Sequence, residues 1–437
     1  MTASVTAPAL PPALRRARHL IALLATAAAL VAVDSFVVGA LTGHIAGSFG
    51  DFAAYLGAAR SMAAGGSPYA QFDPATVVMS GFIYPPFAAL VVRPLALLSN
   101  HAASVAWMLS MLACALAGAI VVARTALPRS WPATGLAVLA ALAFAPATDN
   151  YWSGQINPLI FLLLALAYRD YVRGHQTRCG ALLGLAAGIK VAPVVMVVLL
   201  LRRRWWRGTA AMAVAGALTV GLGAAVLGLG PSITYLTRVL PDLTRATGWV
   251  YDQSLGGAVS RLADQSVLHV QPAGALVQVA GLIPALLVVG LAGWATRART
   301  RPPPERGAEY GLGILAMLLA GGLAWYPTFM HLLIPLFAML GLAAARDRRA
   351  ERSVLVAAGA VAVTFGLIVP LATVDLTIGG IAAVSQTPFW WPFLQLCSLP
   401  CASAVWLAVA LARRLRREVE PADSAHRADA PAVRATA

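Results

Sequence analysis

Long apolar segments separated by short arginine-rich interruptions dominate the sequence. A helix needs about 20 apolar residues to cross the hydrocarbon of a bilayer. Several of the segments approach that length, and the whole chain is 59% hydrophobic and only 11% charged. Soluble domains are less apolar and carry more charge. The chain is therefore predicted to be an all-α integral membrane protein.

The spacing of the apolar segments predicts about twelve transmembrane helices. They are 20–43, 82–99, 101–123, 132–148, 156–168, 179–201, 208–229, 273–296, 307–324, 328–345, 353–372 and 389–412. With both termini in the cytoplasm, the two longest polar connections, 44–81 and 230–272, lie on the extracytoplasmic side. We expect juxtamembrane helices and the active face there.

The net charge of +15 comes almost entirely from arginine, because Lys190 is the only lysine. The basic residues gather beside the apolar segments, as the positive-inside rule requires. The clusters are 15–18, 169–178, 202–207, 297–306, 346–352 and 413–417. Membrane topology accounts for the charge, so no nucleic-acid partner is expected.

The middle of the chain fits a simple topology less well. If 179–201 crosses the membrane, the arginines of 169–178 lie outside while those of 202–204 lie inside, against the positive-inside rule. Alternatively, 179–201 forms two half-helices that break near Lys190 and re-enter on the cytoplasmic side. A second re-entrant segment in 82–99 would then compensate for the lost crossing, so that the remaining spans keep their orientation. Charge alone leaves both topologies open.

A single membrane domain is predicted over 15–417. The tails 1–14 and 418–437 are rich in alanine, proline and charge and lack an apolar period, so we expect them to be disordered. Cys397 and Cys401 are one helical turn apart, but no histidine or acidic residue lies near them in the sequence. We therefore interpret the cysteines as packing residues and predict no metal site.

Asp51 opens the first extracytoplasmic loop, and Tyr55 follows it on the same predicted amphipathic helix. A carboxylate held at the membrane surface can take a proton from an acceptor hydroxyl. An aspartate at the start of a helix is also a common N-cap, so a structural interpretation competes with the catalytic one.

Lys190 lies in the middle of an apolar segment, where an ammonium costs at least about 2.5 to 3.5 kcal/mol. Such a residue usually faces a cavity and an anion, and a phosphate is a natural partner. Pairing with an acidic residue inside the bundle, such as Asp34, is the alternative.

The remaining polar candidates lie at the ends of predicted spans. Tyr84 precedes two prolines, and Gln155 and Asn157 follow Asp149 in a polar stretch between two apolar segments. Amide and aromatic groups suit sugar hydroxyls, but helix ends also need polar groups for their own backbone.

Three further candidates lie in the C-terminal half. Gln253 and Arg261 belong to the second long loop, and His331 follows Pro327 at the head of a span. An arginine can hold a phosphate by a bidentate fork, and a histidine can bind phosphate or relay a proton. The alternatives are a snorkelling arginine and a packed histidine.

Together these motifs resemble the membrane glycosyltransferases of the GT-C superfamily, most closely family 87, the polyprenol-phosphate-mannose-dependent alpha-mannosyltransferases. The shared pieces occur in the family's order over roughly 45–335. They are Asp51 and Tyr55, then Gly66-Ser67-Pro68-Tyr69, Tyr84-Pro85-Pro86 with Arg93-Pro94-Leu95, Gly154-Gln155-Ile156-Asn157, Lys190 and Pro193 with Arg202–Trp205, and Asp252-Gln253-Ser254-Leu255.

The resemblance implies a GT-C type helix bundle that transfers a hexose, with mannose implied by the family, with inversion. The donor would be a polyprenyl-phosphate sugar, and the acceptor a glycolipid or lipid-linked glycan, at the outer face of the cell membrane. Asp51 matches the family's catalytic base. Lys190, His331 and Arg261 are assigned to the donor phosphate. The residues assigned to sugar or acceptor are Tyr84, Gln155, Asn157, Gln253 and Tyr55.

No cofactor is expected, and no metal, because Asp51 has no acidic neighbour in the sequence. A multispan transporter or lipid flippase is the alternative function. Transporters tend to show internal repeats with broken helices in corresponding halves, and the sequence shows no such pairing. The acceptor, the linkage and the sugar itself stay open at this point.

Overall fold

The computed structural model describes residues 50–73, 81–127, 131–263, 274–296, 301–345, 351–370 and 395–417. Every regular element among them is helical, apart from one isolated β-bridge between Asp252 and Trp325. The all-α prediction is confirmed for this part of the chain.

The described helices run from residue 50 to residue 417, and α3 precedes the long spans among them. Their bounds are α3 Gly50–Ala63, α4 Pro86–Val92, η2 Arg93–Leu97, α5 Asn100–Ala126, α6 Trp131–Ala143, α7 Ala145–Ser153, α8 Asn157–Arg173, α9 Gln176–Ile189, η3 Ala192–Met196, α10 Val197–Arg202, α11 Trp206–Leu227, α12 Leu229–Thr234, η4 Tyr235–Val239, α13 Leu240–Leu243, α14 Leu255–Ala263, α15 Ala275–Ala295, α16 Pro303–Leu319, η5 Tyr326–Leu332, α17 Leu333–Ala345, α18 Arg352–Val363, η6 Thr364–Ile368 and α22 Leu399–Arg417.

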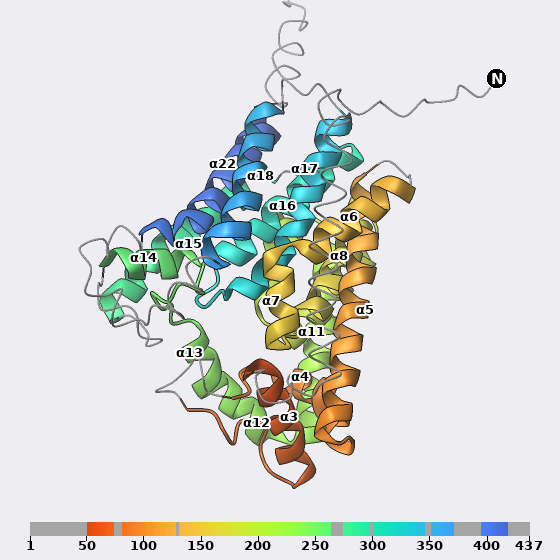
Figure 1. Ribbon diagram of the computed structural model, residues 1–437, viewed down its shortest axis with the longest axis vertical. Coiled ribbons are helices and arrows are strands. Elements are labelled where there is room, and N and C mark those ends of the chain that lie inside the picture. Colours follow the sequence, from red (N-terminus) through yellow and green to blue (C-terminus); the bar gives the residue numbers. More distant parts are fainter. Residues whose placement is uncertain are drawn as a thin grey trace, which may run out of the picture.

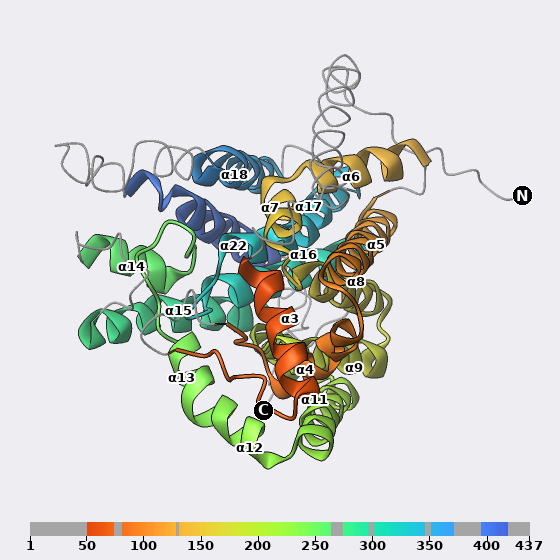
Figure 2. The same ribbon diagram turned by 60° about the horizontal axis from the view of Figure 1, so that its bottom comes forward.

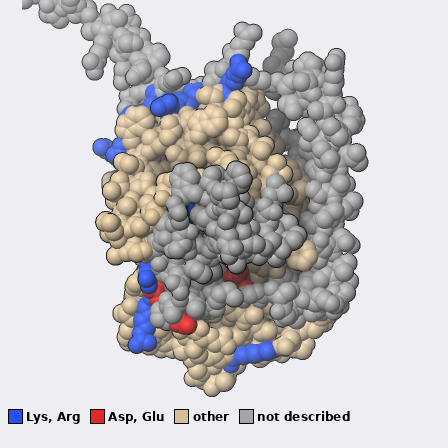
Figure 3. Space-filling model, turned by 60° about the vertical axis from the view of Figure 1, so that its left-hand side comes forward, with Lys and Arg blue, Asp and Glu red and all other residues tan. Residues whose placement is uncertain are grey.

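Four described helices are long and apolar enough to cross a membrane: α5, α11, α15 and the continuous run of η5 and α17. On α11 and α15, large apolar side chains such as Leu218 and Leu286 are 67% and 71% exposed, which suits contact with lipid. On the face in Figure 3, most of the described surface is neither acidic nor basic. The chain is a membrane protein.

Several of the expected spans are not single helices; 132–148, for example, breaks at Phe144 between α6 and α7. The segment 179–201 breaks at Lys190, whose backbone is extended, and continues as η3 and α10. A Cβ added at Gly180 would overlap the carbonyl oxygen of Gly208, and one added at Gly188 would overlap Thr219. These contacts make α9 and α11 parallel, so α10 must return the chain to the end where α9 began. The two half-helices form a re-entrant hairpin.

The re-entrant hairpin resolves the charge conflict in the middle of the chain. Gln176, at the start of α9, lies against Gly208 near the start of α11. The arginines before α9 and those after α10 therefore share one end of the bundle, as the positive-inside rule prefers.

The segment 82–99 is also shorter than a span. It forms α4 and η2, with Pro86 near the start of α4 and Pro94 near the start of η2. Pro86 and Phe87 pack against Gly223 near the far end of α11. The expected count of twelve spans is not confirmed, and the first expected span, 20–43, lies outside the described residues.

The arrangement of the helices divides the molecule into two ends (Figure 1). The long helix α5 runs along one side of the bundle, and α3, α4 and α12 gather near its N-terminal end. Figure 2 brings this end forward, with α3 lying across it. The outer loop helices thus cover one end of the spans, where a site at the membrane surface would open.

A buried ion cluster joins several helices away from that end. Arg203, after α10, pairs with Glu309 of α16, and its Nε donates to Tyr171 Oη of α8 at 2.9 Å. Arg301 lies between Glu305 and Glu309 and donates to the carbonyl oxygen of Leu415 at 3.1 Å. Charged groups inside a bundle need such partners, so this cluster fastens α8, α10, α16 and α22 to one another.

Candidate active site

The carboxylate of Asp51 points into the molecule from the first turn of α3. Its Oδ2 accepts a hydrogen bond from Gln155 Nε2 at 2.7 Å. Burial raises the pKa of Asp51 to about 6, although the bond from Gln155 and the charge of Lys190 both lower it. A carboxylate with a pKa in this range is suited to accept a proton near neutral pH.

Tyr55 and Tyr84 form an aromatic wall beside this carboxylate. Tyr55 Oη donates to Tyr84 Oη at 2.8 Å, and Tyr84 Oη donates to Gln155 Oε1 at 3.2 Å. Their rings pack edge to face with centroids 5.3 Å apart, and Trp107 of α5 packs on Tyr55 at the same distance. The wall fixes the orientation of Gln155 and therefore of the amide that donates to Asp51.

Lys190 lies at the break of the re-entrant hairpin, where its ammonium joins the same network. Nζ donates to Asn157 Oδ1 at 2.7 Å and to Thr328 Oγ1 at 3.0 Å. Asn157 Nδ2 in turn donates to Gln155 Oε1 at 3.3 Å. Both acceptors of Lys190 are neutral, and the expected alternative partner, Asp34, lies outside the described residues. No carboxylate contacts this ammonium among the described residues, which is compatible with the predicted anion site.

His331 lies on η5, three residues after Thr328. In a 3₁₀-helix residues three apart project from the same side. The imidazole is 1% exposed and stacks on Phe161 with ring centroids 6.3 Å apart. Neither ring nitrogen has a hydrogen-bond partner among the described residues. Buried polar atoms normally find partners, so the two unpartnered ring nitrogens keep the predicted phosphate role of His331 open.

Asp149 of α7 brings a second carboxylate to the site, which sequence reasoning missed. Burial, with the charge of Asp51 as the next cause, raises the pKa of Asp149 to about 7. Tyr251 Oη donates to its Oδ1 at 3.4 Å, while Oδ2 is buried without a described partner.

The two carboxylates correct the argument that Asp51 has no acidic companion, because its companion comes from another helix. In the sequence, this companion is indicated by the position of Asp149 at the head of the polar stretch that also holds Gln155 and Asn157. No group of three or more histidine, cysteine, aspartate or glutamate residues gathers in the described part of the chain. The expectation that no metal is needed stays a prediction.

Arg261 and Gln253 lie in a different cluster. Arg261 is fully buried, and its guanidinium donates to Ser398 Oγ at 2.8 Å and to the carbonyl oxygens of Trp249 and Asp252 at 3.0 and 2.8 Å. Gln253 Nε2 donates to the carbonyl oxygens of Val250 and Cys397 at 2.6 and 3.0 Å. Their contacts fasten a loop, while Arg261 Nη2 and Gln253 Oε1 are buried without a partner among the described residues. Their predicted roles toward phosphate and sugar stay predictions.

Asp252 is the centre of this second cluster. Its carboxylate accepts backbone N–H groups from Thr247 and Ser254 at 3.0 Å each and from Ala324 at 3.2 Å. The neighbouring Tyr251 accepts from Tyr326 N at 2.7 Å through its carbonyl oxygen. The second outer loop is thereby tied to the start of η5, which carries Thr328 and His331.

Most of the predicted site residues therefore meet in one network. The matches to known proteins concern the family of the chain. The profile of Glycosyltransferase family 87 matches residues 82–322, more than half of the chain. The protein is a membrane glycosyltransferase by class. It belongs to glycosyltransferase family 87.

Individual relatives are more distant and match only part of the chain. A "Polyprenol-phosphate-mannose-dependent alpha-(1-2)-phosphatidylinositol pentamannoside mannosyltransferase" of Mycolicibacterium smegmatis is 29% identical over 49% of this chain and 53% of its own length. A phosphatidylinositol mannoside mannosyltransferase of Mycobacterium tuberculosis with the same donor is 27% identical over 64% of this chain and 66% of its own. The chain thus spans about half to two thirds of these relatives.

Among solved structures, the chain is similar to ArnT from Cupriavidus metallidurans bound to undecaprenyl phosphate. The TM-score is 0.37 with 16% sequence identity, over 88% of this chain and 77% of that chain. A likeness at this level carries no argument about the site.

Proposed function

We propose that this protein is an inverting mannosyltransferase that uses a polyprenyl-phosphate-mannose donor and a glycolipid or lipid-linked glycan acceptor. The observation that carries the proposal is one hydrogen-bonded line from Asp51 through Gln155 and Asn157 to Lys190. The line joins a proton acceptor to a buried cation. Sugar transfer from a phosphate requires both groups in one site.

Asp51 is the proposed general base. As the acceptor hydroxyl oxygen bonds to C1 of the donor sugar, its proton passes to the carboxylate of Asp51. The bond between C1 and the phosphate oxygen breaks, and its electron pair leaves with the polyprenyl phosphate. A single displacement of this kind inverts the configuration at C1, which agrees with the mechanism that the family resemblance implies.

Lys190 and His331 are the proposed partners of the leaving phosphate, which gains one negative charge in the step. Lys190 holds an ammonium with only neutral acceptors, next to Thr328. His331 keeps unpartnered ring nitrogens on the same side of η5. A preorganised cation in a site shielded from water stabilises such developing charge more strongly than water does.

Tyr55, Tyr84, Gln155 and Asn157 are proposed to shape the sugar site. Their polar atoms bond one another and so orient Asp51 and Lys190. Sugar hydroxyls would replace some of these bonds between side chains. For Arg261 and Gln253 we propose the loop-fastening role that their contacts support.

The names of the relatives favour a phosphatidylinositol mannoside as the acceptor. With both outer loops opposite the arginine clusters, we place the reaction at the extracytoplasmic face of the cell membrane, on a GT-C type bundle. The proposal assigns no step to a metal or cofactor.

The test is transfer by purified protein from radiolabelled polyprenyl-phosphate-mannose to a phosphatidylinositol oligomannoside. Wild type is compared with Asp51→Asn and with the control Asp242→Asn, since the Asp242 side chain pairs with Arg245 at 3.4 Å among the described residues. We expect transfer by wild type and the control and none by Asp51→Asn. Full transfer by Asp51→Asn would move the base elsewhere. A wild type that moves labelled lipid across vesicles and transfers no sugar would favour the flippase.

A further inference from the structure

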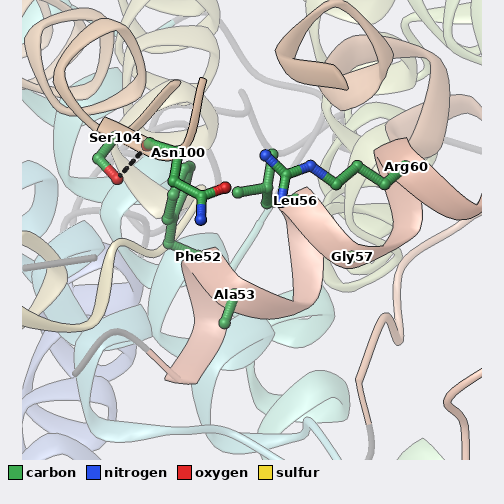
Figure 4. Close-up of a pocket in the computed structure, with 7 residues that line it drawn as sticks. All are labelled: Phe52, Ala53, Leu56, Gly57, Arg60, Asn100 and Ser104. Carbon is green, nitrogen blue, oxygen red and sulfur yellow. Dashed lines mark hydrogen bonds between the residues drawn. The ribbon is translucent and has the colours of Figure 1, made fainter. Parts of the chain in front are cut away.

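The two sides of helix α3 have different surroundings. Phe52, Leu56 and Arg60 lie on the side that faces the start of α5, where they line a surface hollow (Figure 4). Asp51 lies on another side, because its carboxylate bonds to Gln155 just after α7, and α3 also contacts α7. The polar groups that a substrate at Asp51 would meet are therefore those of α7 and of the segments packed on it.

Asp149 of α7 has no role so far in the proposed transfer. Its Oδ1 accepts a hydrogen bond from Tyr251 Oη at 3.4 Å, and its Oδ2 is buried without a partner among the described residues. Burying a carboxyl group without full hydrogen bonding costs free energy, and the charge of Asp51 adds to the cost of ionising it. Carboxyl groups in such settings cluster at functional sites.

The next residue, Asn150, fixes the position of α7. Its Nδ2 donates to the carbonyl oxygens of Pro146 and Pro327 at 2.6 and 2.8 Å, and its Oδ1 accepts from Asn157 Nδ2 at 2.9 Å. These bonds join α7 to the start of α8 and to η5. Asp149 is thus held on a fixed helix, as a residue that selects a substrate should be.

Tyr251 reaches Asp149 from the second outer loop, and its position is also fixed. Its carbonyl oxygen accepts from Tyr326 N at 2.7 Å. Its ring packs edge to face against the rings of Trp325 and Tyr326, with centroids 6.4 and 5.8 Å apart. The Tyr251 hydroxyl therefore occupies Oδ1 and leaves Oδ2. Binding sites for small molecules combine aromatic side chains with a few placed polar groups of this kind.

The direction of the reaction decides which sugar Asp149 meets. In a single displacement the acceptor hydroxyl approaches C1 from the side opposite the leaving phosphate. The proposed base is Asp51 and the proposed phosphate partner is Lys190, so the acceptor ring lies on the Asp51 side. Asp149 belongs to that side, because the charge of Asp51 acts on it and because its hydrogen-bond donor Tyr251 comes from an outer loop.

We propose that Asp149 binds a hydroxyl of the acceptor's terminal sugar, next to the hydroxyl that loses its proton to Asp51. Oδ2 accepts a hydrogen bond from this neighbouring hydroxyl when the carboxyl is ionised and donates one to it when the carboxyl is protonated. The inference rests on the proposed function and deepens it, because the acceptor then needs two neighbouring hydroxyls. Asp51 deprotonates one of them, and Asp149 determines specificity through the other.

The experiment uses short alpha-mannoside acceptors that each lack one hydroxyl of the terminal ring, with labelled polyprenyl-phosphate-mannose as donor. The acceptor that gives no product with any protein identifies the reacting hydroxyl. Loss of the neighbouring hydroxyl should lower the kcat/KM of wild type about 10- to 100-fold, as for loss of a hydrogen bond to a charged group. Asp149→Ala should show the same loss with the full acceptor and no further loss when the neighbouring hydroxyl is removed.

Thr148→Val is the matched control, since Thr148 precedes Asp149 on α7 and its Oγ1 donates to the carbonyl oxygen of Ala145 at 2.8 Å. It should discriminate between the acceptors as wild type does. Equal discrimination by wild type and Asp149→Ala would overturn the inference. A rise in the KM of the donor alone in Asp149→Ala would overturn it as well, by assigning Asp149 to the donor sugar. Absence of transfer by wild type would instead count against the proposed function.

Acceptor binding without the donor separates recognition from chemistry. In isothermal titrations of the protein in detergent, wild type should bind the acceptor that lacks the neighbouring hydroxyl about 10- to 100-fold more weakly than the full acceptor. Asp149→Ala should bind the two equally. Equal binding of both acceptors by wild type would overturn the inference, whatever the transfer assay shows and however the variant folds.

Discussion

Two regions of this protein each combine a buried aspartate with a cation, and they differ in what the polar groups bind. At the first, Asp51 and Lys190 are joined by side chains, namely Gln155 and Asn157. At the second, Asp252 accepts three backbone N–H groups, and Arg261 donates to backbone carbonyl oxygens. Burial and charge alone therefore do not distinguish a site from a structural cluster.

The kind of partner makes the distinction. A bond between two side chains can be exchanged for a bond to substrate after a rotation of either group. Backbone bonds hold the path of a loop, and breaking them leaves buried N–H or C=O groups unpaired at a cost of about 1 to 3 kcal/mol each. The Asp51 region can thus exchange partners during a reaction, whereas the Asp252 region keeps the outer loop on η5.

The sharpest contrast is between Asp51→Asn and Asp252→Ala. Asp51→Asn should lower kcat by about 10²- to 10⁴-fold, the usual contribution of a general base, and leave the Tm of the protein nearly unchanged. Initial rates of mannose transfer and thermal unfolding in detergent measure the two effects. A large fall in Tm together with the rate would make the role of Asp51 structural.

Lys190→Gln should lower kcat/KM for the donor by about 10²- to 10³-fold, the range seen when one electrostatic donor is removed. Stability should hold, because the variant removes a buried charge whose described acceptors are neutral. Arg202→Gln is the control, since Arg202 donates to the carbonyl oxygen of Gly293 at 2.7 Å. Normal donor kinetics in Lys190→Gln would exclude the lysine from the phosphate site.

The pH dependence of transfer should separate the two carboxylates of the site. A base must be deprotonated, so kcat/KM should fall as the pH drops below the Asp51 pKa of about 6. Asp149 has a pKa of about 7 and is therefore mostly protonated where Asp51 titrates, so Asp149→Asn should leave this fall in place. A fall that shifts toward lower pH in Asp149→Asn would show that Asp149 carries a negative charge where Asp51 titrates.

Asp252→Ala should have the smallest effect on the rate per folded molecule and a clear effect on stability. It leaves three buried N–H groups without their acceptor, which should lower the free energy of unfolding by a few kcal/mol. Rates normalised to folded protein should stay within about tenfold of wild type, because only the position of η5 is loosened. A rate as low as that of Asp51→Asn would give Asp252 a direct role.

Some features followed from local sequence alone. Apolar segment length predicted a helical membrane protein. A lysine inside such a segment predicted an anion site, because the bilayer penalises each unpaired charge wherever the fold puts it, and that site stays a prediction. The order of short motifs predicted the family. Local sequence also selected six residues that the structure brings together: Asp51, Gln155, Asn157, Lys190, Tyr55 and Tyr84.

Other features depended on contacts between distant segments. The choice between a span and a re-entrant hairpin at 179–201 was made by Gly180 and Gly188, whose missing side chains let α9 lie parallel to α11. A hydropathy window gives the length of an apolar segment and not its direction. The distribution of the arginines therefore showed that a simple span at 179–201 conflicts with the positive-inside rule, but it did not show which topology the chain adopts.

By itself the sequence determined the class of protein, its membrane setting and the residue types available for chemistry, since composition, apolar length and motif order are local properties. Only the tertiary structure decided which charges act together. Asp149 joins Asp51 from another helix, while Arg261 is bound by the loop around Asp252. The physical reason is that hydrogen bonds and charge interactions act over a few ångströms in space, and distance along the chain does not predict them.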